Sequence, residues 1–497
     1  MTIIEPGYWD VEGRWHDAAA DGIAAVKQAL IAAAPAGPMP AVVWGEGPIV
    51  VALPHGAELA TLTTEHGRVV HVPVAGTGEV TIDGPHDIGY HTVTVVDHDG
   101  TALLQQPVIV APERVVGPEP GERVWGVFAP LYSITHETGG DPVYADLNVV
   151  GELVATFGGT VVGTLPLLAT APDDPSPYSP MSRLVWSDRY QQDRGTGTPG
   201  SELAAVAEAF RARGQRLYLD LPLGAHPGGL DTSGQPWLFA PNIAVGAPPD
   251  VFFDQGQNWG FPPTQPLDPA SVWHFRDVVR HHMAVAGVLR IDHVMGLYRL
   301  YWVPSSATAK EGVYVRYPFE ALLAVLCIES HRHDCWVVGE DLGTVPEEVR
   351  AAMHRHGLLG MWVAEFEVDS WWGGRPFTPP ADAVACVDTH DTPPFATWLG
   401  EHDPLQEPVA VHADIMEALG RTEAAMVLVS LDDLWGETEP QNIPGTPASR
   451  PNWVHQFPVA IEQWADDPRV TEPLRRVDAA RREGMSREGM SGGGHDA

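Results

Sequence analysis

The sequence predicts an α/β protein, a (β/α)8 TIM barrel preceded by a small β-sandwich domain. Three observations lead to this prediction. Short apolar runs separated by Gly, Pro and Asp turns fill residues 41–112, which is the spacing of a sandwich. Strand-like apolar runs then alternate with helical patterns, which is typical of a parallel sheet. Eight such runs follow one another, and eight is the number that closes a barrel.

The first domain is predicted to span residues 1–115, with one leading helix in the Ala-rich stretch 18–34. Its candidate strands are AVVWG, PIVVAL, RVVHVPV, GEVTI, HTVTVVD and QQPVIVA. The Pro/Gly-rich segment VVGPEPGER, residues 115–123, has the composition of a linker and ends the domain.

The barrel is predicted to span residues 122–476, with loop insertions. Its eight candidate strands cover residues 125–133, 160–168, 216–223, 288–294, 335–343, 360–368, 383–391 and 424–434. In the helical pattern between the second and third of these strands, Ser201 is a candidate N-cap and Gly214 the stop. The last residues, 477–497, repeat the letters REGMS and are predicted to form a disordered tail.

Composition restricts the partners and the compartment. There are 65 acidic against 29 basic residues, a formal net charge of −36, so nucleic acid and membrane surfaces are disfavoured as partners. The sequence gives no indication of the oligomeric state. Three cysteines, no secretory leader pattern and no apolar run of about 18 residues predict a cytoplasmic protein.

Polar side chains interrupt the fourth barrel strand, in GVLRIDHVMG, where apolar residues would cost less. The strand ends at Asp292, just as the fifth candidate strand ends at Glu340 and the seventh at Asp391. Because the carboxyl ends of barrel strands face one mouth, we expect these three carboxylates to meet there. Each alone is more often a helix N-cap; the coincidence of three at independently predicted strand ends favours a site.

Crowded, partly buried carboxylates can be held in different protonation states. Retaining glycosidic chemistry requires such a pair, one carboxylate as nucleophile and one carboxyl group as acid/base. Arg290 lies two positions before Asp292 and therefore faces the same side of the strand, where its charge is expected to keep Asp292 ionised at neutral pH.

These motifs resemble those of the α-amylase clan of glycoside hydrolases, and within it the 4-α-glucanotransferases, the amylomaltase or disproportionating-enzyme family. RIDHVMG, VVGEDLGTVPEEV and VDTHDTPPFATW resemble the family's nucleophile, acid/base and seventh-strand motifs. GAPPDVFFDQGQNWGFPP, SPYSPMSRL and LDLP are further matches, and the resemblance covers roughly residues 122–465.

The resemblance implies a role for each matching position. It makes Asp292 the nucleophile, Glu340 the general acid/base and Asp391 the transition-state stabiliser. The residues implied to contact substrate are Arg290, His293, His390, Asp220, Tyr178 and Trp259. Four tryptophans are weaker candidates because most Trp residues are core: Trp237, Trp302, Trp371 and Trp372.

The resemblance also implies an activity, a retaining transfer of α-1,4-glucan segments between maltooligosaccharides through a covalent glycosyl-enzyme. An α-glucan hydrolase on the same machinery is the alternative, and a non-catalytic glucan-binding protein a more distant one. No cofactor or metal is expected. ESHRHDC, residues 329–335, is interpreted as a polar helix end rather than a metal cluster, and the residues around His226 lack the Asn that accompanies calcium in amylases.

The chain departs from the family pattern in places that bear on the acceptor. Leu184 and Asp220 are only 36 positions apart, where the family usually has a helical subdomain, and Val251 stands where the lid usually has Tyr. The second-strand motif ends TLPLLAT, without the Asn and His often found there. Acceptor size and the ratio of transfer to hydrolysis are therefore left open.

Overall fold

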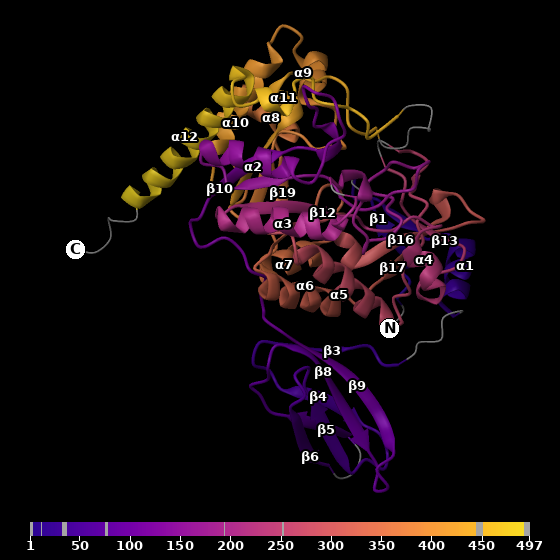
Figure 1. Ribbon diagram of the computed structural model, residues 1–497. Helices are drawn as coiled ribbons and strands as arrows, with labels where there is room; N and C mark the ends of the chain where they lie inside the picture. The colour runs from indigo at the N-terminus through magenta and orange to yellow at the C-terminus, as the bar shows by residue number, and fades with distance from the viewer. Residues whose placement is uncertain are drawn as a thin grey trace.

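Eight parallel strands form a closed barrel at the centre of the molecule (Figure 1). The computed structural model describes residues 3–10, 12–31, 37–74, 78–192, 194–250, 253–443 and 451–491. In chain order the barrel strands are β10 (Val124–Phe128), β11 (Val161–Gly163), β12 (Arg216–Leu221), β15 (Val288–Ile291), β18 (Trp336–Gly339), β19 (Gly360–Val363), β20 (Ala383–Cys386) and β21 (Met426–Ser430).

The barrel closes between β18 and β19. A parallel bridge joins Val338 to Leu359, and the Gly339 N–H donates to the Leu359 carbonyl at 2.8 Å. Seven of the predicted strands contain the observed strand, and the first overlaps β10, which begins one residue earlier, at Val124; every observed strand is shorter than predicted. The fold class is confirmed.

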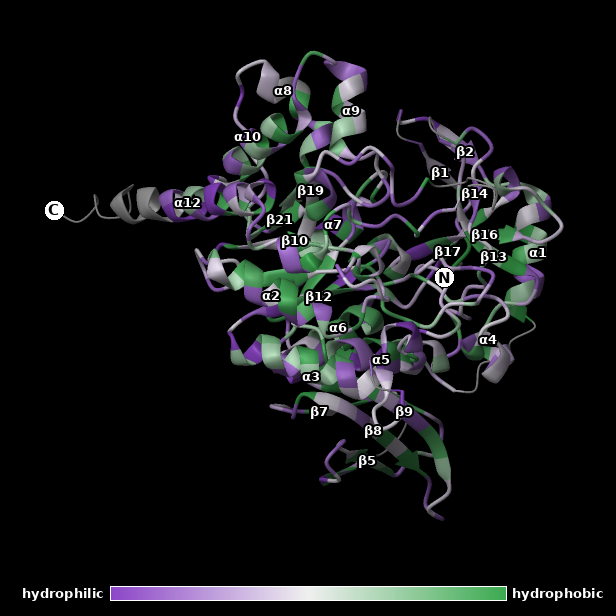
Figure 2. Ribbon diagram, turned by 45° about the horizontal axis from the view of Figure 1, so that its top comes forward, coloured by the Kyte–Doolittle hydropathy of each residue, from purple (hydrophilic) through white to green (hydrophobic). Residues whose placement is uncertain are grey.

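Helices surround the barrel, and the apolar colouring of Figure 2 concentrates on its strands and on the inner faces of those helices. The helices longer than five residues that follow the strands are α2 (Asp146–Thr156), α3 (Pro199–Ala212), α5 (Ala270–Met283), α6 (Phe319–His333), α7 (Glu347–His356), α9 (Phe395–His402), α10 (Pro408–Gly420) and α12 (Pro468–Ser491). The strands are buried on both faces, which explains their continuous apolar sequences. Helix α3 begins earlier than predicted, because Thr198 is its N-cap and Ser201 lies at its third position.

The described residues of the N-terminal β-domain form seven strands. One sheet has the order β3 (Ala41–Trp44), β9 (Ala102–Ala111), β8 (Gly89–Val96), β5 (Leu59–Thr63) and β6 (Val69–Pro73), and a second pairs β4 (Ile49–Leu53) with β7 (Gly78–Ile82). Side chains alternate between buried and half-buried along β8, as expected of a sandwich strand. Strand β5 was not predicted; its sequence LATLT buries Ala60 and Leu62. The exact domain boundaries stay a prediction.

The leading helix does not belong to the sandwich. Helix α1 (Ala20–Ile31) buries Val26, Ala29 and Leu30 against a small sheet inserted in the barrel. That sheet has the order β14 (Gln257–Asn258), β13 (Ile243–Ala247), β16 (Arg299–Pro304) and β17 (Val313–Arg316). The short hairpin of β1 (Gly7–Trp9) and β2 (Trp15–Asp17) lies beside it (Figure 2). Grouping this helix with the sandwich was wrong, because its apolar stripe fits the inserted sheet.

The predicted disordered tail is wrong for its first part. Helix α12 continues through Val477 and Ala480, which are buried against the barrel. Arg481 is 1% exposed, and its guanidinium donates to the carbonyls of Val124 and Ala424 at 2.9 and 2.6 Å. These buried groups fix the helix although its sequence is highly charged. Residues 492–497 lie outside the described residues.

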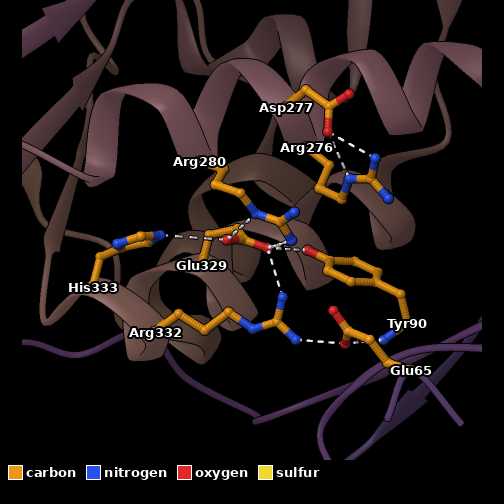
Figure 3. A network of polar contacts seen from close by, with 8 residues as sticks. All are labelled: Glu65, Tyr90, Arg276, Asp277, Arg280, Glu329, Arg332 and His333. Carbon is orange, nitrogen blue, oxygen red and sulfur yellow. Dashed lines mark hydrogen bonds and ion pairs between the residues drawn. The ribbon is translucent and has the colours of Figure 1, made fainter. Parts of the chain in front are cut away.

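The sandwich is attached to the barrel through a buried carboxylate (Figure 3). Glu329 on α6 is fully buried and accepts two hydrogen bonds from Arg280 of α5, at 2.8 and 3.0 Å. The Tyr90 hydroxyl of β8 donates to the same carboxylate at 2.7 Å, and burial and the Glu329 charge raise the pKa of Tyr90 well above its ordinary value. Arg332 bridges Glu329 to Glu65 of the sandwich. The helices that precede β15 and β18 are thus tied to each other and to the sandwich.

In the described part of the chain, no helix is both long enough and apolar enough to cross a membrane.

We predict that Tyr90→Phe destabilises the protein. The substitution removes the donor to a buried carboxylate, which costs about 1–3 kcal/mol in the free energy of unfolding. Urea titration followed by circular dichroism measures the change, with Glu79→Gln on the exposed face of β7 as the control. An unchanged transition in the Tyr90 variant would show that the contact does not contribute.

Candidate active site

A buried arginine organises the first part of the site. Asp220 on β12 and Arg290 on β15 are directly paired in the sheet register, so their side chains lie side by side. Arg290 Nη1 donates to both oxygens of Asp220, at 2.8 and 2.7 Å, and to Asp292 Oδ1 at 3.1 Å. Arg290 is 7% and Asp220 3% exposed. One guanidinium therefore holds two carboxylates at the ends of neighbouring strands.

Asp292 is less acidic than the sequence led us to expect. Burial raises the pKa of Asp292 to about 7; Arg290 opposes this rise, while the charges of Asp220, Glu340 and Asp391 add to it. The expectation that Arg290 keeps Asp292 ionised at neutral pH is therefore met only in part. The physical reason is that Arg290 is shared with Asp220 in a site from which water is largely excluded.

Glu340, at the end of β18, is held by main-chain groups. Its carboxylate accepts hydrogen bonds from the N–H of His293 at 3.0 Å and of Leu342 at 2.9 Å. His293 adopts a left-handed conformation, with φ of 48°, and this turn directs its N–H toward Glu340. Burial nevertheless raises the pKa of Glu340 above its ordinary value. A carboxyl group that keeps its proton in this position can act as a general acid.

The pKa of Asp391 is lowered, in contrast to that of Glu340. Asn442 Nδ2 donates to Asp391 Oδ1 at 2.7 Å, and His390 Nε2 lies 3.2 Å from Oδ2. Although burial opposes it, these contacts lower the pKa of Asp391 well below its ordinary value, with the His390 charge as the largest favourable contribution. Asp391 is therefore ionised throughout the neutral range.

Asn442 was not among the predicted site residues. Its neighbour Gln441 is anchored by the Tyr132 hydroxyl, which donates to the Gln441 Oε1 at 2.7 Å, and by Asp432, which accepts from its amide at 3.1 Å. This anchoring turns Asn442 toward Asp391. Asn442 lies in the polar sequence QNIPGTPASRPNW, which could have pointed to it as a site residue. Residues 444–450 of that sequence lie outside the described residues.

Aromatic rings line one wall of the site. Tyr178 donates to Asp220 Oδ2 at 2.6 Å and stacks on His390, with ring centroids 5.0 Å apart and planes 13° apart. Trp453 packs against both rings, at 5.6 and 6.0 Å, and was also missed. Such a wall offers apolar faces beside carboxylates, which suits a sugar ring with C–H faces and hydroxyl edges.

Trp259 borders the site from the inserted sheet. Its ring makes an edge contact with His293, with centroids 5.3 Å apart, while its indole N–H donates to Gln257. Val251, the departure in the lid, lies outside the described residues.

The four weaker tryptophan candidates are not brought to the carboxylates by any of the described contacts. Trp302 is fully buried in the core with α1, so it cannot meet a ligand. Trp371 stacks on Phe377, and Trp372 packs against Trp398. Trp237 is 56% exposed.

ESHRHDC falls at the end of α6, as interpreted, and runs into β18. Asp334 is the left-handed residue that ends the helix, and Glu329 belongs to the interface with the sandwich. Within the residues described, no group of three or more His, Cys, Asp or Glu side chains is arranged to hold a metal ion.

The structure thus brings Asp292, Glu340 and Asp391 to one rim of the barrel, close enough that the latter two affect the pKa of Asp292. A barrel with a protonatable and an ionised carboxylate at its strand ends is typical of enzymes acting on glycosidic bonds. The chain belongs to the 4-alpha-glucanotransferase family: the glycoside hydrolase 77 model, described as 4-alpha-glucanotransferase, matches residues 200–460.

Curated relatives are similar over part of the chain. The 4-alpha-glucanotransferase of Haemophilus influenzae is 41% identical over 201 residues, 40% of this chain and 29% of that protein. The 4-alpha-glucanotransferase of Mycobacterium tuberculosis is 32% identical over 339 residues, 57% of this chain and 47% of that protein. The chain thus spans less than half the length of these relatives.

Among solved structures, amylomaltase from Corynebacterium glutamicum has the same fold. The two superpose with a TM-score of 0.83 at 21% identity, over 96% of this chain and 98% of that chain.

We predict that Asp292→Asn stabilises the protein at alkaline pH. A carboxyl group whose pKa is raised on folding makes folding less favourable once the unfolded chain releases its proton, so this penalty grows from about pH 4 to about pH 7 and then levels off. The variant lacks the penalty. Its melting temperature should exceed that of the wild type at pH 8, with the difference shrinking toward pH 4.

Asp99→Asn, at a 70% exposed side chain of the sandwich, is the matched control and should show no such pH-dependent difference. A constant offset between Asp292→Asn and wild type at every pH would contradict a raised pKa for Asp292.

Proposed function

We propose that the protein is a retaining 4-α-glucanotransferase, which moves α-1,4-glucan segments between maltooligosaccharides. The observation that carries the proposal is the pairing of Asp292, beside Arg290, with the protonatable Glu340 at the adjacent strand end. Family membership and the amylomaltase fold support the same activity.

In the first step, the ionised Asp292 carboxylate attacks the anomeric carbon of the donor glucose, and Glu340 gives its proton to the leaving glycosidic oxygen. This forms a covalent bond between Asp292 and the glucose and releases the rest of the glucan. Glu340, now ionised, then takes the proton of an acceptor hydroxyl, whose oxygen displaces Asp292. Asp391 stabilises the positive charge that develops on the sugar ring in both steps.

The neighbouring side chains orient the donor sugar. Asp220 is held by Arg290 and Tyr178, so its free lone pairs have a fixed direction toward the site. His390 is fixed between Tyr178 and Asp391. Together with His293 and Trp259, these residues are proposed to contact sugar hydroxyls and ring faces.

The acceptor side is built from little protein. In the described residues between Leu184 and Asp220, the chain forms one short 3-10 turn (Asp188–Tyr190) and helix α3 before it reaches β12. A smaller acceptor side makes it easier for water to replace the acceptor, which is the specific observation that favours α-glucan hydrolysis as a second function. A purely glucan-binding role is opposed by the intact carboxylates.

We also propose a cytoplasmic location, supported by three buried, free cysteines: Cys327, Cys335 and Cys386. The proposed units are the sandwich before residue 115 and the barrel from residue 122.

Incubation with maltotriose tests the activity. We expect glucose together with a series of longer maltooligosaccharides, separated by chromatography. Glucose and maltose without longer products would identify a hydrolase instead.

Asp292→Asn tests the assigned nucleophile. Loss of a covalent nucleophile should reduce turnover by at least about 10³-fold, while binding of a maltooligosaccharide is retained. Asp99→Asn, at an exposed side chain of the sandwich, is the control. Undiminished turnover in Asp292→Asn would exclude this assignment.

A further inference from the structure

A second group of carboxylates lies behind the proposed site, at the ends of the last three barrel strands. Glu365 follows β19, Asp388 follows β20, and Asp433 lies in the short helix α11 (Leu431–Leu434) that begins at the end of β21. Their exposed fractions are 6, 7 and 2%. They were not singled out in the sequence, and the proposed mechanism does not use them.

Each of these carboxylates contacts the segment that carries His390 and Asp391. Asp388 is in the segment itself, and its carboxylate neighbours that of Asp433. Asp433 Oδ1 accepts from the main-chain N–H of Phe395 at 3.3 Å. The cluster therefore holds residues 388–395 near both ends.

Glu365 is linked to the middle of the same segment. Its carboxylate lies beside Thr392, and its main-chain N–H donates to the carbonyl of Val387, next to Asp388, at 3.1 Å. The Thr392 hydroxyl accepts from the Thr389 N–H at 2.9 Å, and the Thr389 hydroxyl in turn accepts from the Asp391 N–H at 3.3 Å. Two hydroxyl groups, those of Thr392 and Thr389, thus connect Glu365 to the main chain of Asp391.

The cluster has more acceptors than donors. Glu365 Oε1, Asp433 Oδ2 and both ring nitrogens of His412 are buried without a hydrogen-bond partner of adequate geometry among the described residues. His412 on α10 is 1% exposed, and its Nε2 lies 3.3 Å from Asp433 Oδ2. One imidazole can offset one negative charge, so three buried carboxylates cannot all be ionised at low cost.

Other titratable or charged groups surround the three carboxylates and come from each element packed against them. They are Cys386 of β20, Asp432 of α11, His412 of α10 and Arg290 of β15.

We propose that the buried carboxylates Glu365, Asp388 and Asp433 act as positioning residues for Asp391. While the cluster keeps its protons, its hydrogen bonds hold residues 388–395 in the arrangement seen here. When protons are lost to solvent at alkaline pH, the carboxylates repel one another and release the segment. This inference rests on the proposed function for the role of Asp391 itself.

The electrostatic environment agrees with this geometry. Burial, followed by the Asp433 charge, raises the pKa of Glu365 to about 8, and burial with the neighbouring carboxylates raises the pKa of Asp388 well above its ordinary value. Glu365 is therefore protonated at neutral pH, and the release falls on the alkaline side.

The first test is the pH profile of glucan transfer in Glu365→Gln. Glutamine keeps the side-chain shape and can bond to Thr392 but cannot ionise. We expect kcat at pH 6–7 within about twofold of wild type, and an alkaline limb displaced upward by about one pH unit or more. Glu367→Gln, two residues away and exposed, should keep the wild-type profile. A Glu365→Gln profile that superimposes on wild type, or is lowered equally at every pH, overturns the proposal.

The second test does not depend on activity. Hydrogen exchange read by mass spectrometry, corrected for the intrinsic effect of pH, reports the protection of residues 388–395. We expect protection in the wild type to fall by about tenfold between pH 7 and 9 and to persist in Glu365→Gln. Constant protection in the wild type overturns the proposal. A protein without transfer activity that still shows this loss of protection would refute the proposed function while supporting the cluster.

Discussion

The site depends on the burial of one guanidinium among carboxylates. Arg290 lies inside a barrel rim where Asp220 and Asp292 converge, and without it two nearby acids would be left buried and unpaired. Because a single cation serves both, it compensates Asp292 only partly, and the pKa of Asp292 remains raised. Arg290 offsets enough of the cost of burying these carboxylates for the fold to tolerate them. Asp292 nevertheless stays poorly solvated, as a nucleophile requires.

The remainder of the structure keeps these groups in place. The Glu329 network ties α5 and α6, the helices that lead into the strands of Asp292 and Glu340, to each other and to the sandwich. Helix α12 closes the other side of the barrel through Arg481. The sandwich can therefore be understood as a support for the half of the barrel that carries the catalytic pair.

The carboxylates at the strand ends of this barrel form two groups with different surroundings. In the proposed site, burial raises the pKa of Glu340, whereas the His390 charge and the hydrogen bonds from His390 and Asn442 lower that of Asp391. Behind the site, burial and the neighbouring Asp433 charge raise the pKa values of Glu365 and Asp388. The difference arises from neighbours supplied by other strands and not from the residue type.

The sequence by itself determined the barrel, because eight apolar runs separated by helical patterns can bury both faces only in a closed parallel sheet. It also determined which strand ends carry Asp292, Glu340 and Asp391, since strand position alone fixes which rim a residue reaches. Tertiary structure decided what depends on distant neighbours. It placed α1 on the inserted sheet, ordered α12 through Arg481, and turned Asn442 and Trp453 toward Asp391 and Tyr178. It also set the protonation of Asp292, because a pKa follows from burial and from charges many residues away, and no local pattern encodes those distances.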